Sequence, residues 1–147
     1  MVTRILVRAH GGPEVLEVDD GTLAAPKAGE VRLRHTAIGL NYIDTYFRTG
    51  LYPPPAGLPY TPGLEAAGVI EALGDGVDGL QVGQRVAYGA GPLGAYSTER
   101  NIPAEKVIAI PDSIADETAA AMMLKGMTAQ YLLRQTYEVQ AGDTLLI

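Results

Sequence analysis

Residues 39–52, GLNYIDTYFRTGLY, gather several side chains that could do chemistry. They include the amide Asn41, the acid Asp44 and the phenols Tyr46 and Tyr52. An asparagine three residues before an acid is typical of a helix N-terminus, so we expect a short helix from about Tyr42. A tyrosine ring can stack on a ligand while its hydroxyl makes a hydrogen bond. The segment therefore predicts either a short core helix or one wall of a binding site.

Helical spacing divides the aromatic residues of this segment. Side chains four apart lie on one side of a helix, so Ile43 pairs with Phe47 and Tyr42 with Tyr46. We expect the apolar pair in the core, Tyr46 toward a cleft, and Tyr42 in a structural place. Tyr52 precedes three prolines, which stiffen the loop that follows. It is either a substrate gate or an ordinary surface tyrosine.

A second group of candidates lies near the C-terminus: Lys125, Thr128 and Gln130. A lysine here could offer its charge to a phosphate or to a polarised oxygen. Thr128 could cap a helix, and Gln130 is the weaker candidate. The plain alternatives are a solvated lysine and an ordinary cap. No metal site is expected, because the chain has no cysteine and its two histidines match no ligand spacing.

The composition limits the class of protein. The chain has 147 residues, 47% of them hydrophobic and 19% charged, which is typical of one globular domain. The net charge is −6 and no basic cluster occurs, so neither nucleic acid nor an anionic membrane is an expected partner. No segment approaches the roughly 20 apolar residues that span a bilayer. The lack of cysteine suits a reducing compartment, and we expect a cytoplasmic protein.

Short alternating segments separated by Gly and Pro predict a mainly β fold with some α, as a sandwich or a rolled, barrel-like sheet. Strands are expected at residues 2–8, 15–18, 30–38, 64–73, 84–89, 94–98 and 106–110. Two helices are expected afterwards, at 115–124 and 127–137, with Gly126 interrupting them.

The apolar run TLLI at residues 144–147 follows a Gly-Asp turn. It is typical of the opening of a buried parallel strand, and the alternative is an edge strand of the first sheet. We expect three parts: a β-rich domain at 1–112, connecting helices at 113–136, and the first strand of a truncated second domain at 137–147.

Six stretches in order resemble the N-terminal domain of the medium-chain dehydrogenase/reductase superfamily, in its zinc-free quinone oxidoreductase branch of the zeta-crystallin type. They are GGPEVLEV (11–18), AIGLNYIDTYFRTGLYP (37–53), PGLEAAGVIEALGDGV (62–77), VGQRVAYG (82–89), GAYSTE (94–99) and AAAMMLKGMTAQYLL (119–133). The resemblance implies a GroES-like β-rich barrel domain, followed by a doubly wound dinucleotide-binding domain. No G-x-G-x-x-G occurs, and the glycines at 74–79 are read as turn residues.

The resemblance also implies an activity. Zinc-dependent relatives place their metal ligands at positions that here hold Asn41, Leu64 and Lys125, and zinc prefers thiolate, imidazole or carboxylate. This points to hydride transfer without zinc, from NADPH to a quinone or a conjugated carbonyl. The implied cofactor contacts are Asn41, Asp44, Lys125, Thr128 and Gln130, and the implied substrate contacts are Tyr46 and Tyr52.

Other readings stay open beside this one. The chain could be a non-catalytic GroES-like binding or structural module, or part of an alkenal or enoyl reductase of the same superfamily. The isolated chain is expected to be inactive, and a homo-oligomer could form through the missing domain. The residues that separate NADPH from NADH would lie after Ile147.

Overall fold

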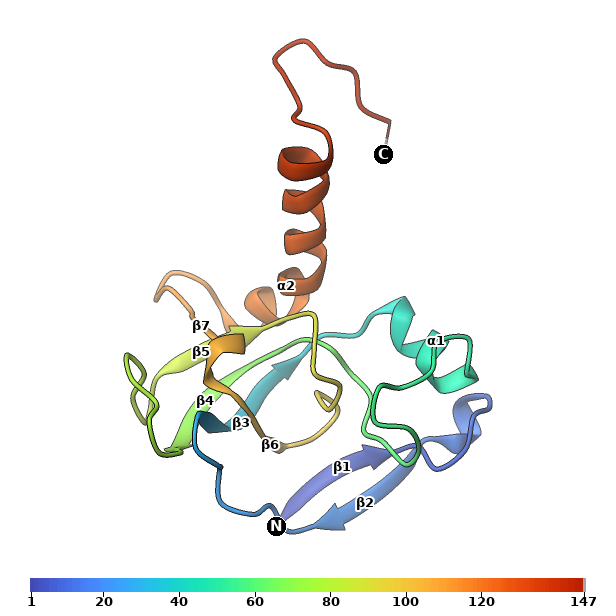
Figure 1. The fold of residues 1–147 in the computed structure, drawn as a ribbon, viewed down its shortest axis with the longest axis vertical. Helices are drawn as coiled ribbons and strands as arrows, with labels where there is room; N and C mark the ends of the chain where they lie inside the picture. The colour runs from blue at the N-terminus through green and yellow to red at the C-terminus, as the bar shows by residue number, and fades with distance from the viewer. Residues whose placement is uncertain (147) are drawn as a thin grey trace.

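The computed structural model describes residues 1–146, which are built mainly of antiparallel strands with two helices (Figure 1). The expected mainly β architecture is thereby confirmed. The strands are β1 Val2–Leu6, β2 Glu17–Gly21, β3 Glu30–Ile38, β4 Ala66–Leu73, β5 Arg85–Tyr88, β6 Glu99–Pro103 and β7 Ile108–Ala109. The helices are α1 Tyr42–Thr49 and α2 Asp116–Tyr131, and a π-helical turn, Leu132–Thr136, continues α2. Short 3-10 turns lie at Pro13–Val15 and Ala104–Lys106.

The strands form two open sheets. β1 and β2 pair with each other, and the larger sheet has the order β6-β3-β4-β5-β7. Backbone hydrogen bonds link β1 and its extension to the loops beside the larger sheet, from Ile5 N to Tyr96 O (2.8 Å) and from Val7 N to Tyr60 O (2.9 Å). The result is a rolled β body without closure into one continuous barrel.

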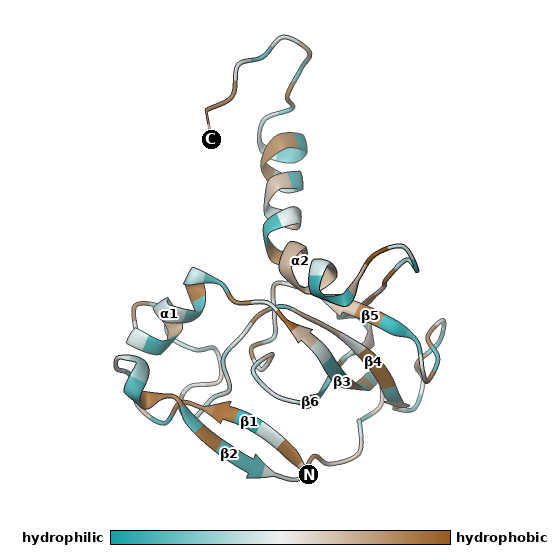
Figure 2. Cartoon of the chain, turned by 180° about the vertical axis from the view of Figure 1, so that it is seen from behind, coloured by the Kyte–Doolittle hydropathy of each residue, from teal (hydrophilic) through white to brown (hydrophobic). Residues whose placement is uncertain are grey.

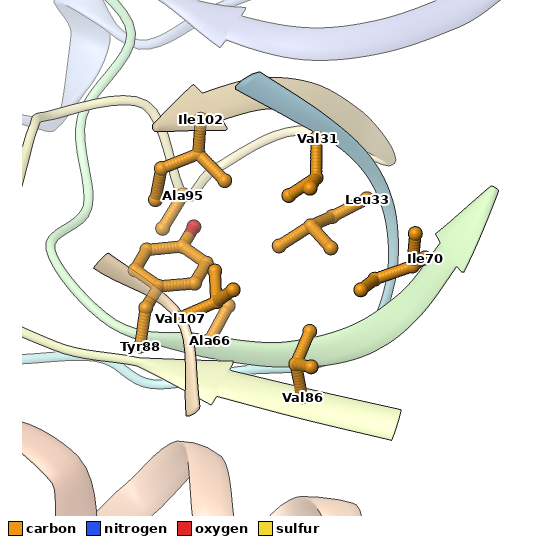
Figure 3. Packing of buried hydrophobic residues seen from close by; sticks show 9 residues of the cluster. All are labelled: Val31, Leu33, Ala66, Ile70, Val86, Tyr88, Ala95, Ile102 and Val107. Carbon is orange, nitrogen blue, oxygen red and sulfur yellow. The ribbon is translucent and has the colours of Figure 1, made fainter. Parts of the chain in front are cut away.

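Alternation along β3 explains the main core. Val31 and Leu33 are fully buried, while the alternate residues Arg32 and Arg34 point to the other face. Figure 3 shows their side chains converging with those of the neighbouring strands. The cluster comprises Val31, Leu33, Ala66, Ile70, Val86, Tyr88, Ala95, Ile102 and Val107.

The first half of α2 packs on the larger sheet through small residues. Ala119 and Ala120 are buried there, beside Ala67 and Ala87. The start of the helix is fixed by Asp116, whose carboxylate accepts hydrogen bonds from the Thr36 hydroxyl (2.5 Å) and the Arg85 guanidinium (Nε, 2.8 Å). The bond from Thr36, and then the contact with Arg85, lower the pKa of Asp116.

The second half of α2 projects away from the β body (Figure 1). This half and the π-helical turn after it contain apolar residues, brown in Figure 2. Several of these side chains are exposed. They include Met127, Tyr131, Leu132 and Leu133, each at least 40% exposed. Within residues 1–146, no helix is long and apolar enough to cross a membrane.

The predicted break at Gly126 is wrong, because α2 runs without interruption from Asp116 to Tyr131. A glycine inside a helix costs only about 1 kcal/mol relative to alanine, and the residues around it are good helix formers. The local preference was therefore too weak to end the helix.

The predicted strand at 94–98 is also wrong. The backbone N–H groups of Gly94 and Ala95 donate to Gly63 O, and that of Tyr96 donates to Pro62 O. Gly94 has a φ of 130°, which breaks a regular ladder. The strand begins later, as β6, and pairs with β3.

The end of the chain tests the last expected strand only in part. Thr144–Leu146 form no strand, and Ile147 lies outside the described residues. A second domain that starts at residues 137–147 therefore stays a prediction.

Candidate functional site

Helix α1 begins at the predicted place, with Asn41 as its N-cap residue. The Asp44 carboxylate reaches back to accept a hydrogen bond from Asn41 N–H (Oδ2, 3.0 Å). This bond satisfies a backbone donor that a helix start leaves free. The Asn41 side chain makes two short hydrogen bonds of its own, to residues from β4's entry loop and from α2.

Glu65 is the centre of this contact. Its side chain is fully buried, and its Oε1 accepts a hydrogen bond from Asn41 Nδ2 (2.7 Å). Its Oε2 accepts one from the backbone N–H of Leu124 (2.6 Å). The approach is close, because a Cβ built on Gly39 would lie 2.4 Å from Glu65 Cγ and 2.5 Å from Ala120 O. Gly39 is therefore required for α1, Glu65 and α2 to meet.

Lys125 completes a cluster that we call the Asn41–Glu65–Lys125 network. The ammonium Nζ donates to Asn41 Oδ1 (2.7 Å) and lies 3.4 Å from Glu65 Oε1. Glu65 is fully buried, but the Lys125 side chain is 61% exposed. The network thus carries a fixed anion inside and a cation at the surface. It brings together Asn41 and Lys125, which belong to two separate groups of candidate residues in the sequence.

Asp44 forms a second polar contact on the inner side of α1. Its Oδ2 also accepts a hydrogen bond from the Tyr96 hydroxyl (2.8 Å). Burial raises the pKa of Asp44 above its usual value. Burial and the bond to Asp44 also raise the pKa of Tyr96. The other carboxylate oxygen, Oδ1, is buried and has no hydrogen-bond partner among the described residues.

A cavity of about 90 Å³ adjoins this carboxyl group. Its lining combines apolar and polar side chains: Leu16, Leu40, Asn41, Asp44, Thr45, Arg48, Pro62 and Tyr96. An unpaired buried carboxylate oxygen beside a small cavity fits a hydroxyl or amide donor, since such groups are costly to leave unpaired.

The tyrosines form an aromatic row at the surface. Tyr46 meets Tyr42 and Tyr52 edge to face, with 5.4 Å between ring centroids in each case. Tyr52 also lies 6.0 Å from Phe47. Tyr42 is 75% exposed but packs edge to face on Tyr46, so the structural role expected for it stays a prediction.

The predicted inner face of α1 also needs correction. Ile43 and Phe47 are only half-buried, and Asp44 is the one fully buried residue of the helix. The reason is that α1 packs on polar partners, Asn41's network and Tyr96, and not on the apolar core. Apolar spacing alone therefore pointed to the wrong side of the helix.

Thr128 and Gln130 lie apart from the Asn41–Glu65–Lys125 network. The Thr128 hydroxyl donates to Leu124 O within α2 (2.8 Å), so the predicted helix cap at Thr128 is wrong. Gln130 is exposed, and its side chain has no hydrogen bond within residues 1–146. Their predicted contact with a cofactor stays untested.

Glu65 and Tyr96 are site residues that were not predicted from the sequence. A signal for Glu65 exists, because a lone acid in the apolar segment PGLEAAGVI must be paired if it is buried. Nothing local indicated Tyr96. Among the described residues, no three His, Asp or Glu side chains gather as a metal site would require.

Known proteins match this chain closely. The family model described as "Alcohol dehydrogenase GroES-like domain" matches residues 27–139. A quinone oxidoreductase of Pseudomonas aeruginosa is 57% identical over 146 residues, covering 99% of this chain and 45% of that protein. A 2-haloacrylate reductase of a Burkholderia species is 47% identical over 151 residues, covering 100% of this chain and 45% of that protein.

A solved structure agrees with these matches. The Escherichia coli quinone oxidoreductase complexed with NADPH superposes with a TM-score of 0.91 at 50% identity, covering 94% of this chain and 42% of that one. The chain therefore spans less than half the length of the relatives it matches.

Proposed function

Because this chain belongs to the alcohol dehydrogenase GroES-like domain family, within the medium-chain dehydrogenase/reductase superfamily, we propose that it is the substrate-binding part of an NADPH-dependent quinone reductase. The Asn41–Glu65–Lys125 network carries this proposal, because it is a preorganised polar site with one exposed cation. Relatives of the chain that are named quinone oxidoreductases, one of them solved with NADPH, support the proposed reaction and the proposed cofactor.

The residues fit the nicotinamide end of such a cofactor. The unpaired Asp44 Oδ1 can accept a hydrogen bond, and the exposed Lys125 ammonium adds a positive charge nearby. When bound, NADPH would supply the hydride. Asn41 and Asp44 would hold the reacting end, Lys125 would lie beside it, and Thr128 and Gln130 would contact the cofactor farther along α2.

The aromatic row suits the acceptor side of the site. Tyr46 and Tyr52 lie edge to face and are partly exposed, so they can offer ring faces to a planar quinone. We assign both to substrate contact. Zinc takes no part in this proposal, because an amide and an ammonium at positions 41 and 125 are poor ligands for it.

An activated alkene is a second candidate acceptor. The relative named 2-haloacrylate reductase favours it, since that substrate class also takes a hydride at a conjugated carbon. A cytoplasmic location and a homo-oligomer stay predictions.

The proposal can be tested by assays on the protein in its natural length. NADPH binding is followed by nicotinamide fluorescence, and turnover by the loss of nicotinamide absorbance with a benzoquinone, a naphthoquinone and a 2-haloacrylate. We expect quinone turnover. We also expect Asn41→Ala to raise the Kd for NADPH about 10-fold or more, because Asn41 holds Glu65 and Lys125 in place and a hydrogen bond to a charged group is worth about 1.5–3 kcal/mol.

Asn101→Ala is the matched control, because its amide bonds to Ala24 O, outside the Asn41–Glu65–Lys125 network. This control should bind NADPH as the wild type does. A wild-type protein that binds no NADPH and reduces none of the acceptors would refute the proposal and favour a non-catalytic module.

A further inference from the structure

We infer that Lys125 is a catalytic residue, which stabilises and protonates the oxygen of the acceptor during hydride transfer. This inference rests on the proposed reductase function. Hydride addition to a quinone or a conjugated carbonyl forms one new C–H or O–H bond and moves an electron pair onto the acceptor oxygen. A positively charged donor at that oxygen lowers the barrier, because it stabilises the negative charge that develops on the oxygen only in the transition state.

The hydrogen bonds of Lys125 leave one donor for this task. An ammonium group has three N–H donors. One goes to Asn41 Oδ1 at 2.7 Å and a second points to Glu65 Oε1 at 3.4 Å. The side chain is 61% exposed, so the third N–H can face a ligand. Within the described part of the chain, Lys125 Nζ makes no other hydrogen bond or ion pair.

The remaining contacts hold the ammonium still. Glu65 is fully buried, and its Oε2 binds the backbone N–H of Leu124, directly before Lys125. Its Oε1 binds the Asn41 amide, so Asn41 cannot rotate away from Lys125 without breaking a buried hydrogen bond. Glu65 is therefore a positioning residue. A lysine whose ammonium is already held, and whose preceding residue is bonded to the same carboxylate, loses little further entropy on binding an anion.

Other cations near α1 do not meet these conditions. The Arg48 guanidinium donates to Gly11 O, away from the Asn41–Glu65–Lys125 network. Arg85 is held by Asp116 at the other end of the α2 contact. Among the described residues, Lys125 is the cation bonded within the Asn41–Glu65–Lys125 network.

The chemical step balances without another reactant. When bound, the reduced nicotinamide would supply the hydride and its two electrons, and the acceptor oxygen would take a proton from Lys125 Nζ. The neutral amine then takes a proton from water, which its exposure allows. The sum is the reduced nicotinamide, the acceptor and one proton giving the oxidised nicotinamide and the reduced acceptor.

The test uses the natural-length protein and the variants Lys125→Met, Lys125→Arg and Lys125→Ala. We expect Lys125→Met to lower kcat for a naphthoquinone about 10²–10³-fold, as the loss of one transition-state donor does elsewhere. Lys125→Arg should keep part of the activity. Lys106→Met is the matched control, since Lys106 pairs with Glu105 at the surface and makes no bond to the Asn41–Glu65–Lys125 network, and it should keep wild-type kcat.

Chemical rescue separates a catalytic lysine from a structural one. Methylammonium should restore part of the activity of Lys125→Ala, and tetramethylammonium, which has a charge but no N–H, should not. A readout without turnover is the binding of nitrophenol: the wild type should bind the coloured phenolate form, and Lys125→Met should not.

The outcomes keep the two proposals apart. An inactive wild type would defeat the proposed reductase and this inference with it. An active wild type with a fully active Lys125→Met, or equal rescue by both ammonium salts, would overturn the role of Lys125 alone. Circular dichroism of each variant confirms that a loss of activity is not a loss of fold.

Discussion

Glu65 is a buried carboxylate whose two oxygens receive hydrogen bonds from three directions. Its replacement by glutamine should destabilise the fold by about 1–3 kcal/mol, since the new amide NH₂ must face a donor and leave it unpaired in the interior. The free energy of unfolding in urea measures this effect.

The control for this prediction is Glu71→Gln. Glu71 also accepts from a cation, Arg34 (2.7 Å), but both side chains are more than one-third exposed. Surface pairs of this kind contribute about 0–1 kcal/mol. Equal losses for Glu65→Gln and Glu71→Gln would show that burial of Glu65 is not what makes it important.

His35 should make the stability of the fold depend on pH. Its ring Nδ1 lies 2.7 Å from Ser97 O and its Nε2 lies 3.0 Å from the Tyr88 hydroxyl. Burial lowers the pKa of His35 to about 4. A histidine in the unfolded chain has a pKa of about 6.5. Between these two values the unfolded chain therefore binds more protons than the folded chain. Stability should therefore fall as pH decreases from about 6.5 to about 4.

Unfolding free energies measured across this pH range, with an NMR titration of the ring, check the prediction. His35→Gln should flatten the pH dependence in this window, and His10→Gln, at an exposed position, should leave it in place. An unchanged slope in His35→Gln would assign the acid loss to other groups.

At the scale of elements, a substitution at Gly126 can test whether α2 is continuous. A Cβ added at Gly126 would meet only Met122 Cε, at 3.7 Å, which is ordinary contact. Gly126→Ala should therefore stabilise the protein by about 0.5–1 kcal/mol, because alanine is the better helix former. Urea unfolding provides the measurement.

Gly89→Ala is the contrasting variant. There a Cβ would lie 2.9 Å from both Met123 Cβ and Met127 Cε, so α2 or β5's end must shift. We expect a loss of stability from overpacking, of about 1–3 kcal/mol. A loss of similar size in Gly126→Ala would contradict an unbroken helix at that position.

Local patterns explain which elements the sequence could predict. Alternation in β3 is strict, so its buried face, Val31 and Leu33, followed directly. The start of α1 followed from Asn41 and Asp44, because a cap is a contact between near neighbours. The pairing of Glu65 with Lys125 joins residues 60 apart, and no local pattern carries such a contact. The strand predicted around Gly94 was wrong for a similar reason, since the backbone there bonds to a loop that is distant in sequence.

At the scale of the whole molecule, the β body and the projecting half of α2 differ in what holds them. The strands bury the core cluster shown in Figure 3, and Val31, Leu33 and Ile102 are fully inaccessible. Residues 127–136 have no buried side chain. Amide protons should therefore exchange slowly in β3 and β6, and far faster in residues 127–136, where opening breaks few tertiary contacts.

Hydrogen–deuterium exchange followed by mass spectrometry checks this, with the packed first half of α2 around Ala119 and Ala120 as the internal reference. Protection should fall along α2 from that half toward Tyr131. Uniform protection along α2 would contradict the prediction, because an exposed helix of this length is only marginally stable in water. It would mean that another molecule covers the apolar side chains of Tyr131, Leu132 and Leu133.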